Sequence, residues 1–283
     1  MTDPIFSFGL LADVQYADDP TDPRTGRHYR ESPAKLRAAV DDFNRHDLAF
    51  VAHLGDFVDH DPANAAPLLK ITADLSAPFH QVLGNHDFAS TTSPTGRSDP
   101  ADLFKAYGMA SPYYAFDQPG WRFLVLDTNE VGVIEYPPGS PQAAGGEALL
   151  ARIRQQGRSN AHPWNGTIGA DQRRWLADQL QDAAERGLRA AVLAHHAVHP
   201  DHHDNLLDDH ELRDWLAGFE ALAAWFNGHQ HAGGYGRYRG IHYLTLHGVV
   251  QETTNAYAVA QVYPDRIMII GSGRQPSYEL HLD

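Results

Sequence analysis

The 283-residue chain contains no cysteine, which excludes a disulfide scaffold, a thiolate metal site and a cysteine nucleophile. It also lacks any run of about 18 apolar residues, so we expect no transmembrane helix. The amino terminus, MTDPIFSFGLLADV, has no cationic leader, and we expect a cytoplasmic protein. Basic residues are few: 22 Lys and Arg stand against 36 Asp and Glu, giving a formal net charge of −14. This balance argues against polymeric nucleic acid and anionic membranes as partners.

Histidine, in contrast, is abundant, with 18 residues in the chain. Histidine is the commonest metal ligand and the usual proton carrier near neutral pH, so the positions of these residues decide what they mean. The length suits one large domain or two small ones. Because no polar linker divides the chain, we expect a single domain over residues 1–283.

Helical and strand patterns alternate along the chain. We expect helices over residues 32–45, 170–186 and about 208–217, and strands over 5–12, 48–54, 79–83, 113–116, 121–127, 188–194 and 221–226. The part from Tyr235 onward is almost all strand. Residues 128–168, rich in Gly and Pro, are predicted to form a long active-site loop or lid. The pattern favours a sheet with crossover helices packed on a second sheet.

Polar side chains that can bind metal follow five of these strands, at the point where each apolar run stops. They are Asp13, Gln15, Asp56, Asn85, His195, His229 and His231. Each alone also fits a turn, a helix cap or a structural histidine. Ligands of sheet proteins collect beyond the carboxyl ends of strands, so five such groups predict a metal site at one rim. We expect the alternate pair His229 and His231 to lie in extended chain and point the same way.

The donor types narrow the metal. Nitrogen and oxygen donors without sulfur suit Mn, Fe, Zn, Co or Ni, and three histidines argue against a magnesium site built only from oxygens. Seven side chains are too many for one catalytic ion that keeps open positions, but they suffice for two ions that share a bridging carboxylate. Two-metal sites serve phosphatases, nucleases and aminopeptidases.

The motif order D-x-Q, GD-x-x-D, GNHD, H and GH-x-H over residues 10–231 resembles the calcineurin-like metallophosphoesterase superfamily. Further segments resemble its manganese-dependent ADP-ribose/CDP-alcohol diphosphatase family almost end to end. These are Gln15 in place of the usual His, Trp164-Asn165-Gly166, Asp171-Gln172 and Gly240-Ile241-His242. The chain departs from that family at Asp87, Ala232 and His247. The resemblance implies an α/β (α+β) fold: a four-layer α/β/β/α sandwich of two mixed sheets flanked by helices.

The resemblance also implies roles for the rim residues. Asp13, Gln15 and His231 would hold one ion, Asn85, His195 and His229 the other, and Asp56 would bridge them. Mn²⁺ is the expected metal, with Fe, Zn or Co as alternatives. A metal-bridging hydroxide would attack phosphorus in line. His86 would protonate the leaving oxygen while Asp59 orients its ring; the other interpretation of Asp59 is a cap for the next helix.

The implied reaction is cleavage of the diphosphate bond of ADP-ribose or of CDP-alcohols such as CDP-choline. The expected partner is therefore a small nucleoside-diphosphate substrate, with Tyr16, Arg27 and Arg30 as candidate contacts. Surface packing explains each of these three equally well. The alternative is another phosphodiesterase of the superfamily, acting on cyclic nucleotides or glycerophosphodiesters. A scaffold without activity is disfavoured, because every ligand position and His86 are present.

Overall fold

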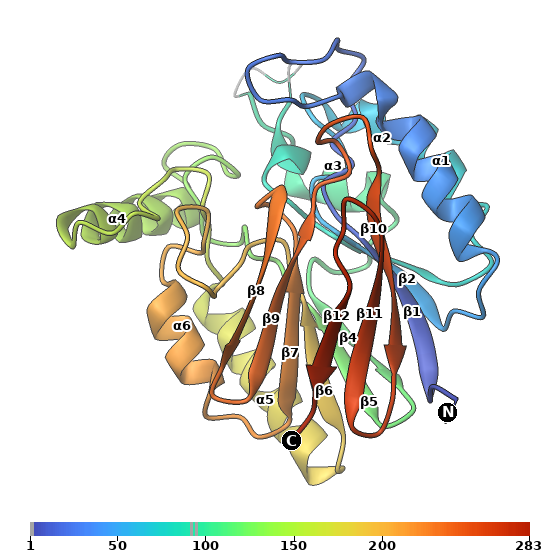
Figure 1. Ribbon diagram of the computed structural model, residues 1–283. Helices are drawn as coiled ribbons and strands as arrows, with labels where there is room; N and C mark the ends of the chain where they lie inside the picture. The colour runs from blue at the N-terminus through green and yellow to red at the C-terminus, as the bar shows by residue number, and fades with distance from the viewer. Residues whose placement is uncertain (1–2, 91–92, 94–95) are drawn as a thin grey trace.

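The computed structural model describes residues 3–90, 93 and 96–283, and its strands form two six-stranded sheets (Figure 1). In spatial order the first sheet contains β12 (Tyr278–His281), β11 (Arg266–Gly273), β10 (Ala256–Val262), β1 (Phe6–Leu11), β2 (Phe50–Leu54) and β3 (Phe79–Val82). The second contains β4 (Tyr114–Gln118), β5 (Trp121–Val125), β6 (Arg189–Leu193), β7 (Leu222–Asn227), β9 (Ile241–His247) and β8 (Ala232–Tyr238).

Both sheets are mixed. In the first, β1, β2 and β3 are parallel, and β1 pairs antiparallel with β10. In the second, β5, β6, β7 and β9 are parallel, with β4 and β8 antiparallel at the two edges. The parallel strands of each sheet therefore deliver their carboxyl ends to one edge. Since β1 and β10 come from distant parts of the chain, we propose that residues 1–283 form a single domain.

Helices cover the outer faces of both sheets. On the first sheet lie α1 (Ser32–Phe43), α2 (Ala65–Thr72) and α3 (Pro100–Ala106), which share a buried apolar cluster with β1 and β2. On the second lie α5 (Ala170–Glu185) and α6 (Asp209–Leu216). This arrangement confirms the predicted four-layer α/β/β/α sandwich. In the described residues, no helix has both the length and the apolar character needed to cross a bilayer.

The facing sides of the two sheets enclose an aromatic core. Phe8 stacks on Phe50 at 4.8 Å between ring centroids, and Phe50 meets Phe123 of the other sheet edge-on, also at 4.8 Å. Side chains alternate along β1, so Phe8 faces this core while Leu11 faces the helices. Truncating such a buried Phe to Ala typically costs about 3–5 kcal/mol, so this core fixes where the strand ends lie.

The segment 128–168 is more ordered than predicted. It contains the 15-residue helix α4 (Pro141–Gln155), which extends away from the body of the molecule (Figure 1). Ser140 caps this helix by accepting a hydrogen bond from the Ala143 amide, and Pro141 occupies its first turn. The prediction of one continuous loop was wrong because Gly and Pro outweighed these start signals. Two of the shorter helices, α2 and α3, were not predicted at all.

Candidate metal centre and catalytic site

Five parallel strands bring the predicted site residues together at one edge of the sandwich. Asp13 and Gln15 follow β1, Asp56 and Asp59 follow β2, Asn85 and His86 follow β3, His195 follows β6, and His229 and His231 follow β7. Asp13, Gln15 and His195 have no solvent exposure, and Asp56 is 1 % exposed. Burying carboxylates and imidazoles costs stability, and proteins gather such groups mainly at functional sites. This edge of the sandwich is therefore a candidate functional site.

Asp56 and His195 lie at the middle of the group. The Nε2 atom of His195 is 3.3 Å from Oδ2 of Asp56 and 3.1 Å from Oδ1 of Asn85. The second oxygen of Asp56, Oδ1, accepts a hydrogen bond from the His86 amide at 2.8 Å. Gly84 leaves room for this arrangement, because a Cβ there would collide with the Asp56 carboxylate. Donor atoms of three strand ends thus face one another.

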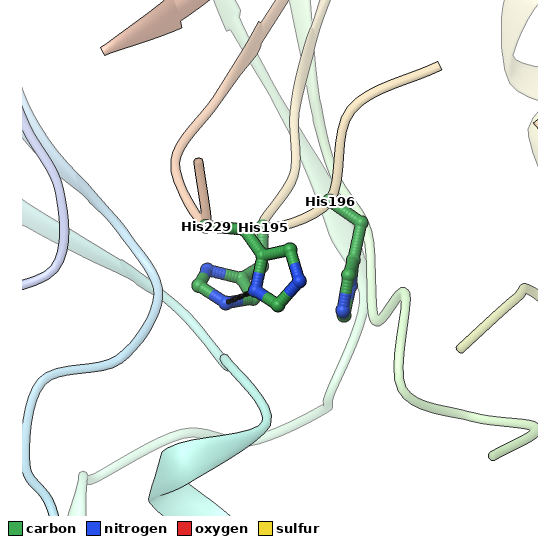
Figure 2. A group of neighbouring side chains, drawn as sticks. All are labelled: His195, His196 and His229. Carbon is green, nitrogen blue, oxygen red and sulfur yellow. Dashed lines mark hydrogen bonds between the residues drawn. The ribbon is translucent and has the colours of Figure 1, made fainter. Parts of the chain in front are cut away.

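Figure 2 shows His195 and His229 with their rings directed toward each other. The Nδ1 atom of His229 lies 3.1 Å from Nε2 of His195. Metal–ligand bonds of about 2.1 Å at right angles place neighbouring ligand atoms about 3 Å apart, so this spacing fits shared coordination. The third ring in the figure, His196, is not free to join, because its two nitrogens contact Thr128 Oγ1 and the Trp164 carbonyl.

Asp13, Gln15 and His231 form the other half of the group. His231 Nε2 is 3.7 Å from Oδ1 of Asp13, and the side-chain Nε2 of Gln15 is 3.5 Å from Oδ2 of Asp56. The buried Oε1 atom of Gln15 has no hydrogen-bond partner in the described part of the chain. An orphaned oxygen in a group of carboxylates and imidazoles fits a divalent cation, so the residues present match the two-metal site implied by the sequence.

The backbone at these strand ends is strained. Seven non-glycine residues among those described have positive φ, and four of them belong to this group: Asp13 (54°), Gln15 (45°), Asp56 (56°) and His229 (69°). Left-handed φ costs such residues roughly 1–3 kcal/mol each and tends to occur at functional sites. The expected extended conformation of the His229–His231 pair was wrong, because His229, two residues after the end of β7, has a left-handed φ.

Each of the three histidines has its outer ring nitrogen fixed by a different partner. His195 donates from Nδ1 to the Leu54 carbonyl at 2.9 Å, and His229 directs Nε2 at Asn165 Oδ1 at 3.3 Å. His231 directs Nδ1 at Gln251 Oε1 at 3.2 Å. The opposite nitrogen of each ring faces another member of the group: Nε2 of His195 faces Asp56, Nε2 of His231 faces Asp13, and Nδ1 of His229 faces His195. Partners of this kind set the tautomer and orientation of metal-binding histidines.

The two carboxylates titrate differently. Burial, opposed by His195, raises the pKa of Asp13 to about 7. Burial acts on Asp56 as well, but the charges of His195 and His86 outweigh it and hold the pKa of Asp56 well below its ordinary value. Although burial opposes it, Asp56 raises the pKa of His195 to about 9. Both carboxylates therefore depend on nearby positive charge, which divalent cations supply.

His86 lies at the edge of the group with its Nδ1 atom 2.9 Å from Asp59 Oδ1. Burial lowers the pKa of His86, but Asp56 and Asp59 together raise it above the ordinary value. Asp59 does not cap the following helical turn, because Asp61 performs that function for η2 (Pro62–Asn64) by accepting from the Ala63 amide. Asp87, which follows His86 in the chain, is buried. It accepts hydrogen bonds from the backbone amides of residues 56, 57, 58 and 84 and from Tyr107 Oη.

A cavity of about 440 Å³ opens beside this group. Its described lining consists of Arg27, Asp56, Asn85, His86, Ile134, Trp164, Asp204, His229 and His231. Of the three predicted substrate contacts, Arg27 lies in this lining. Arg30 instead pairs with Asp18 at the surface, and Tyr16 packs on the apolar cluster beneath the helices of the first sheet. Ile134 and Trp164 come from the two ends of the segment predicted as the active-site loop.

Some residues of the site were not identified from the sequence. Asn165 and Trp164 were part of a resembling motif without an assigned role, and Gln251 and Asp204 were not singled out. Asp204 accepts a hydrogen bond from Trp164 Nε1 at 3.0 Å and lies against His202 and His203 at the cavity rim. A polar residue in a loop carries no pattern of its own, so only contacts formed on folding identify these four.

The fold and this group of donors define a dinuclear metal-dependent hydrolase. Residues 6–233 match the calcineurin-like phosphoesterase family, and the chain belongs to that family. It is similar to the manganese-dependent ADP-ribose/CDP-alcohol diphosphatases of Danio rerio, at 30% identity over 97% of both proteins, and of Homo sapiens, at 29% identity over 96% of this chain and 91% of the human protein. A crystal structure of a dimetal phosphatase from Danio rerio superposes with a TM-score of 0.85 at 26% identity, covering 99% of this chain and 100% of that one.

Proposed function

We propose that this chain is a Mn²⁺-dependent diphosphatase that cleaves ADP-ribose or CDP-alcohols to a nucleoside monophosphate and a second phosphorylated product. The observation that carries the proposal is the group of seven candidate metal ligands, five buried and two half-buried, beside the His86–Asp59 pair. The similar proteins of known name support the substrate class and the metal. A cytoplasmic location stays a prediction of the sequence.

The contacts support the two metal positions that the family resemblance implies. Asp13, Gln15 and His231 would hold one ion, and Asn85, His195 and His229 the other, with the Asp56 carboxylate between them. Divalent ions bound there supply positive charge for the phosphoryl oxygens and make water acidic enough to attack phosphorus at neutral pH. The protein's contribution is to hold these seven donors in place before substrate arrives.

His86 would act on the leaving side of the reaction. With Nδ1–H held by Asp59, its Nε2–H is the proton available to the cavity. Hydrolysis forms a bond from water oxygen to phosphorus and breaks the bond from phosphorus to the bridging oxygen. The leaving phosphate takes its proton from His86, which recovers one from the attacking water through solvent. General acid catalysis of this kind contributes about 10²–10⁴-fold.

The cavity lining suits a small diphosphate with an aromatic base. Arg27 offers a guanidinium at the side of His86 and His231, where phosphate oxygens would lie. The Trp164 ring, stacked on His162 at 4.3 Å, is 36% exposed and offers a flat apolar surface for a base. A volume of about 440 Å³ is typical of sites for single small molecules.

The test is a substrate panel with product identification. The enzyme, loaded with Mn²⁺, would be assayed on ADP-ribose, CDP-choline, cyclic AMP and glycerophosphocholine, with chelator and with Mg²⁺ as comparisons. We expect AMP from ADP-ribose or CMP from CDP-choline, at rates well above those on both diesters. Asp56→Asn is the control and should lose turnover and take up less metal. Rapid hydrolysis of cyclic AMP or glycerophosphocholine, without activity on either diphosphate, would overturn the proposal.

A further inference from the structure

The cavity residue Arg27 is carried by a loop that lies against the segment after β9. We refer to residues 18–28 as the Arg27 loop and to residues 248–252 as the Gln251 segment. Arg27 forms an isolated antiparallel bridge with Gln251, the Glu252 amide donates to the Gly26 carbonyl at 2.9 Å, and the His28 amide donates to the Val250 carbonyl at 2.8 Å. The two backbones are therefore tied on both sides of Gln251.

Two cationic side chains donate hydrogen bonds to backbone carbonyls of the Gln251 segment. Lys35 of α1 donates from Nζ to the Val249 carbonyl at 2.8 Å and also to the Glu252 carbonyl. Arg274 donates from Nη2 to the Gly248 carbonyl at 2.5 Å. Because cationic side chains fix the carbonyls on either side of it, the position of Gln251 is set by the fold and does not depend on substrate.

The side-chain amide of Gln251 joins two parts of the site. Its Nε2 atom donates to the Thr25 carbonyl in the Arg27 loop at 2.5 Å, and its Oε1 atom lies 3.2 Å from Nδ1 of His231. A carbonyl can only accept, so the NH₂ group must face Thr25 and the oxygen must face His231. His231 is then protonated on Nδ1, which leaves the lone pair of Nε2 directed at Asp13, 3.7 Å away.

The fit around this amide is tight. Gly26 has a φ of +71°, and a Cβ there would lie 2.7 Å from Gln251 Nε2. Gln251 therefore contacts the Arg27 loop at Gly26 as well as at Thr25, and a shift of the loop must move the amide. A shift of the amide in turn changes the partner of His231.

We propose that Gln251 is a positioning residue that couples the metal-facing ring of His231 to the Arg27 loop. One amide sets the tautomer of a metal ligand with its oxygen and the place of a phosphate-binding arginine with its nitrogen. Metal binding at His231 and the observed position of the Arg27 loop therefore favour each other, and such coupling is reciprocal. The inference rests on the proposed function in that Arg27 and His231 act on the same diphosphate.

Two variants separate the two halves of the amide. Gln251→Glu keeps an oxygen acceptor for His231 but loses the donor to Thr25, whereas Gln251→Met is similar in size and loses both. Gln275 provides a matched control, since this buried amide accepts from the His247 amide and donates to the Pro276 carbonyl, and its side-chain hydrogen bonds involve neither His231 nor the Arg27 loop. Gln275→Met should lower thermal stability without affecting the loop or the metal.

Two substrate-free measurements report on the halves. Mn²⁺ affinity by calorimetry follows His231, and the rate of tryptic cleavage at Arg24 follows the loop, since the Arg24 side chain is 88% exposed. We expect Gln251→Met to lose about 10–100-fold in affinity for one of the two ions and to be cleaved faster. Gln251→Glu should bind Mn²⁺ as tightly as the wild type or more tightly, yet be cleaved faster by trypsin. In a separate assay with substrate, it should show a raised KM and a smaller change in kcat.

Equal Mn²⁺ affinity in the two Gln251 variants would overturn the proposal, as would cleavage at Arg24 that neither variant accelerates. A loss of stability alone, of the size found for Gln275→Met, would equally reduce Gln251 to a packing role. Because both measurements omit substrate, they stand apart from the proposed function. A wild-type enzyme that fails to cleave ADP-ribose and CDP-choline would refute that function and leave the coupling testable.

Discussion

The Nδ1 atom of His86 lies 2.9 Å from Oδ1 of Asp59, and the carboxylate is 5 % exposed while the imidazole ring is 26 % exposed. One side of the ring is thus anchored to a buried charge and the other is open to the cavity. The pair has the geometry of a proton donor held in one tautomer by a carboxylate.

His86→Ala should lower kcat by about 10²–10⁴-fold while two Mn²⁺ ions remain bound, because the ring contributes a proton and no metal bond. Asp59→Asn should cause a smaller loss, since the ring remains but its tautomer is no longer fixed. Steady-state kinetics and metal analysis of the purified variants check this. Asp61→Asn, at the neighbouring cap and outside the His86–Asp59 pair, is the control. Loss of metal from His86→Ala would place His86 among the ligands instead.

Asn165 should matter for metal binding although it is expected to touch no metal. Its Oδ1 atom lies 3.3 Å from His229 Nε2, and its Nδ2 atom donates to the Asn160 and His203 carbonyls. Asn165→Ala releases the outer nitrogen of His229 and should lower Mn²⁺ affinity about 10–100-fold by calorimetry. Asn205→Ala removes another buried amide, bonded to Pro200 and Asp209, and should spare that affinity. Equal affinities in the two variants would contradict the assignment.

Asp87 holds the loop that carries Asp56, and Tyr107 completes its set of donors with a hydrogen bond of 2.7 Å. Tyr107→Phe removes one donor to a buried carboxylate and should lower the free energy of unfolding by about 1–3 kcal/mol. Urea denaturation measures this. The comparison is Tyr263→Phe, whose hydroxyl meets Gln261 at 3.1 Å and is expected to change stability by less than about 0.5 kcal/mol. A similar effect of both substitutions would show that Tyr107 does not support the loop.

Glu135 predicts a dependence of stability on pH. The side chain is fully buried, and burial raises its pKa from 4.5 to about 8. Between these values the native state keeps a proton that the unfolded chain has lost, so the free energy of unfolding falls as pH rises through this window. Glu135→Gln removes the titration. Denaturant unfolding should find this variant more stable than the wild type above pH 8, by a few kcal/mol, with a difference that shrinks toward low pH. Parallel pH profiles for the two proteins would contradict the prediction.

The strand ends that form the site could be predicted from the sequence because each candidate metal ligand follows an apolar run. Asp13, Asp56 and His195 follow the carboxyl ends of β1, β2 and β6. Because ligands of sheet proteins collect beyond the carboxyl ends of strands, this position indicates a role for all three. The alternation of strands and helices predicts a sheet with crossover helices packed on a second sheet, whereas the family resemblance implies the four layers. These features depend on residues that are close together in the chain.

Other features of the site depend on contacts between distant residues. Gln251 and Thr25 are 226 positions apart, and no local pattern announces their hydrogen bond. The left-handed φ of His229 accompanies a hydrogen bond of 3.0 Å from its amide to the Asp13 carboxylate, which is 216 positions away. Helix α4 was not predicted because its glycines are typical of a loop. In the structure they serve close packing, as where Gly146 lies against the Gly132 backbone.

In the proposed site, seven side chains from five strand ends bind two metal ions. Anomalous diffraction from crystals grown with Mn²⁺ and recorded on both sides of the manganese absorption edge tests it directly. We predict two anomalous peaks, one beside Asp13, Gln15 and His231 and one beside Asn85, His195 and His229, with Asp56 contacting both. A single peak at this edge of the sheets, or manganese bound only elsewhere, would contradict a two-metal site.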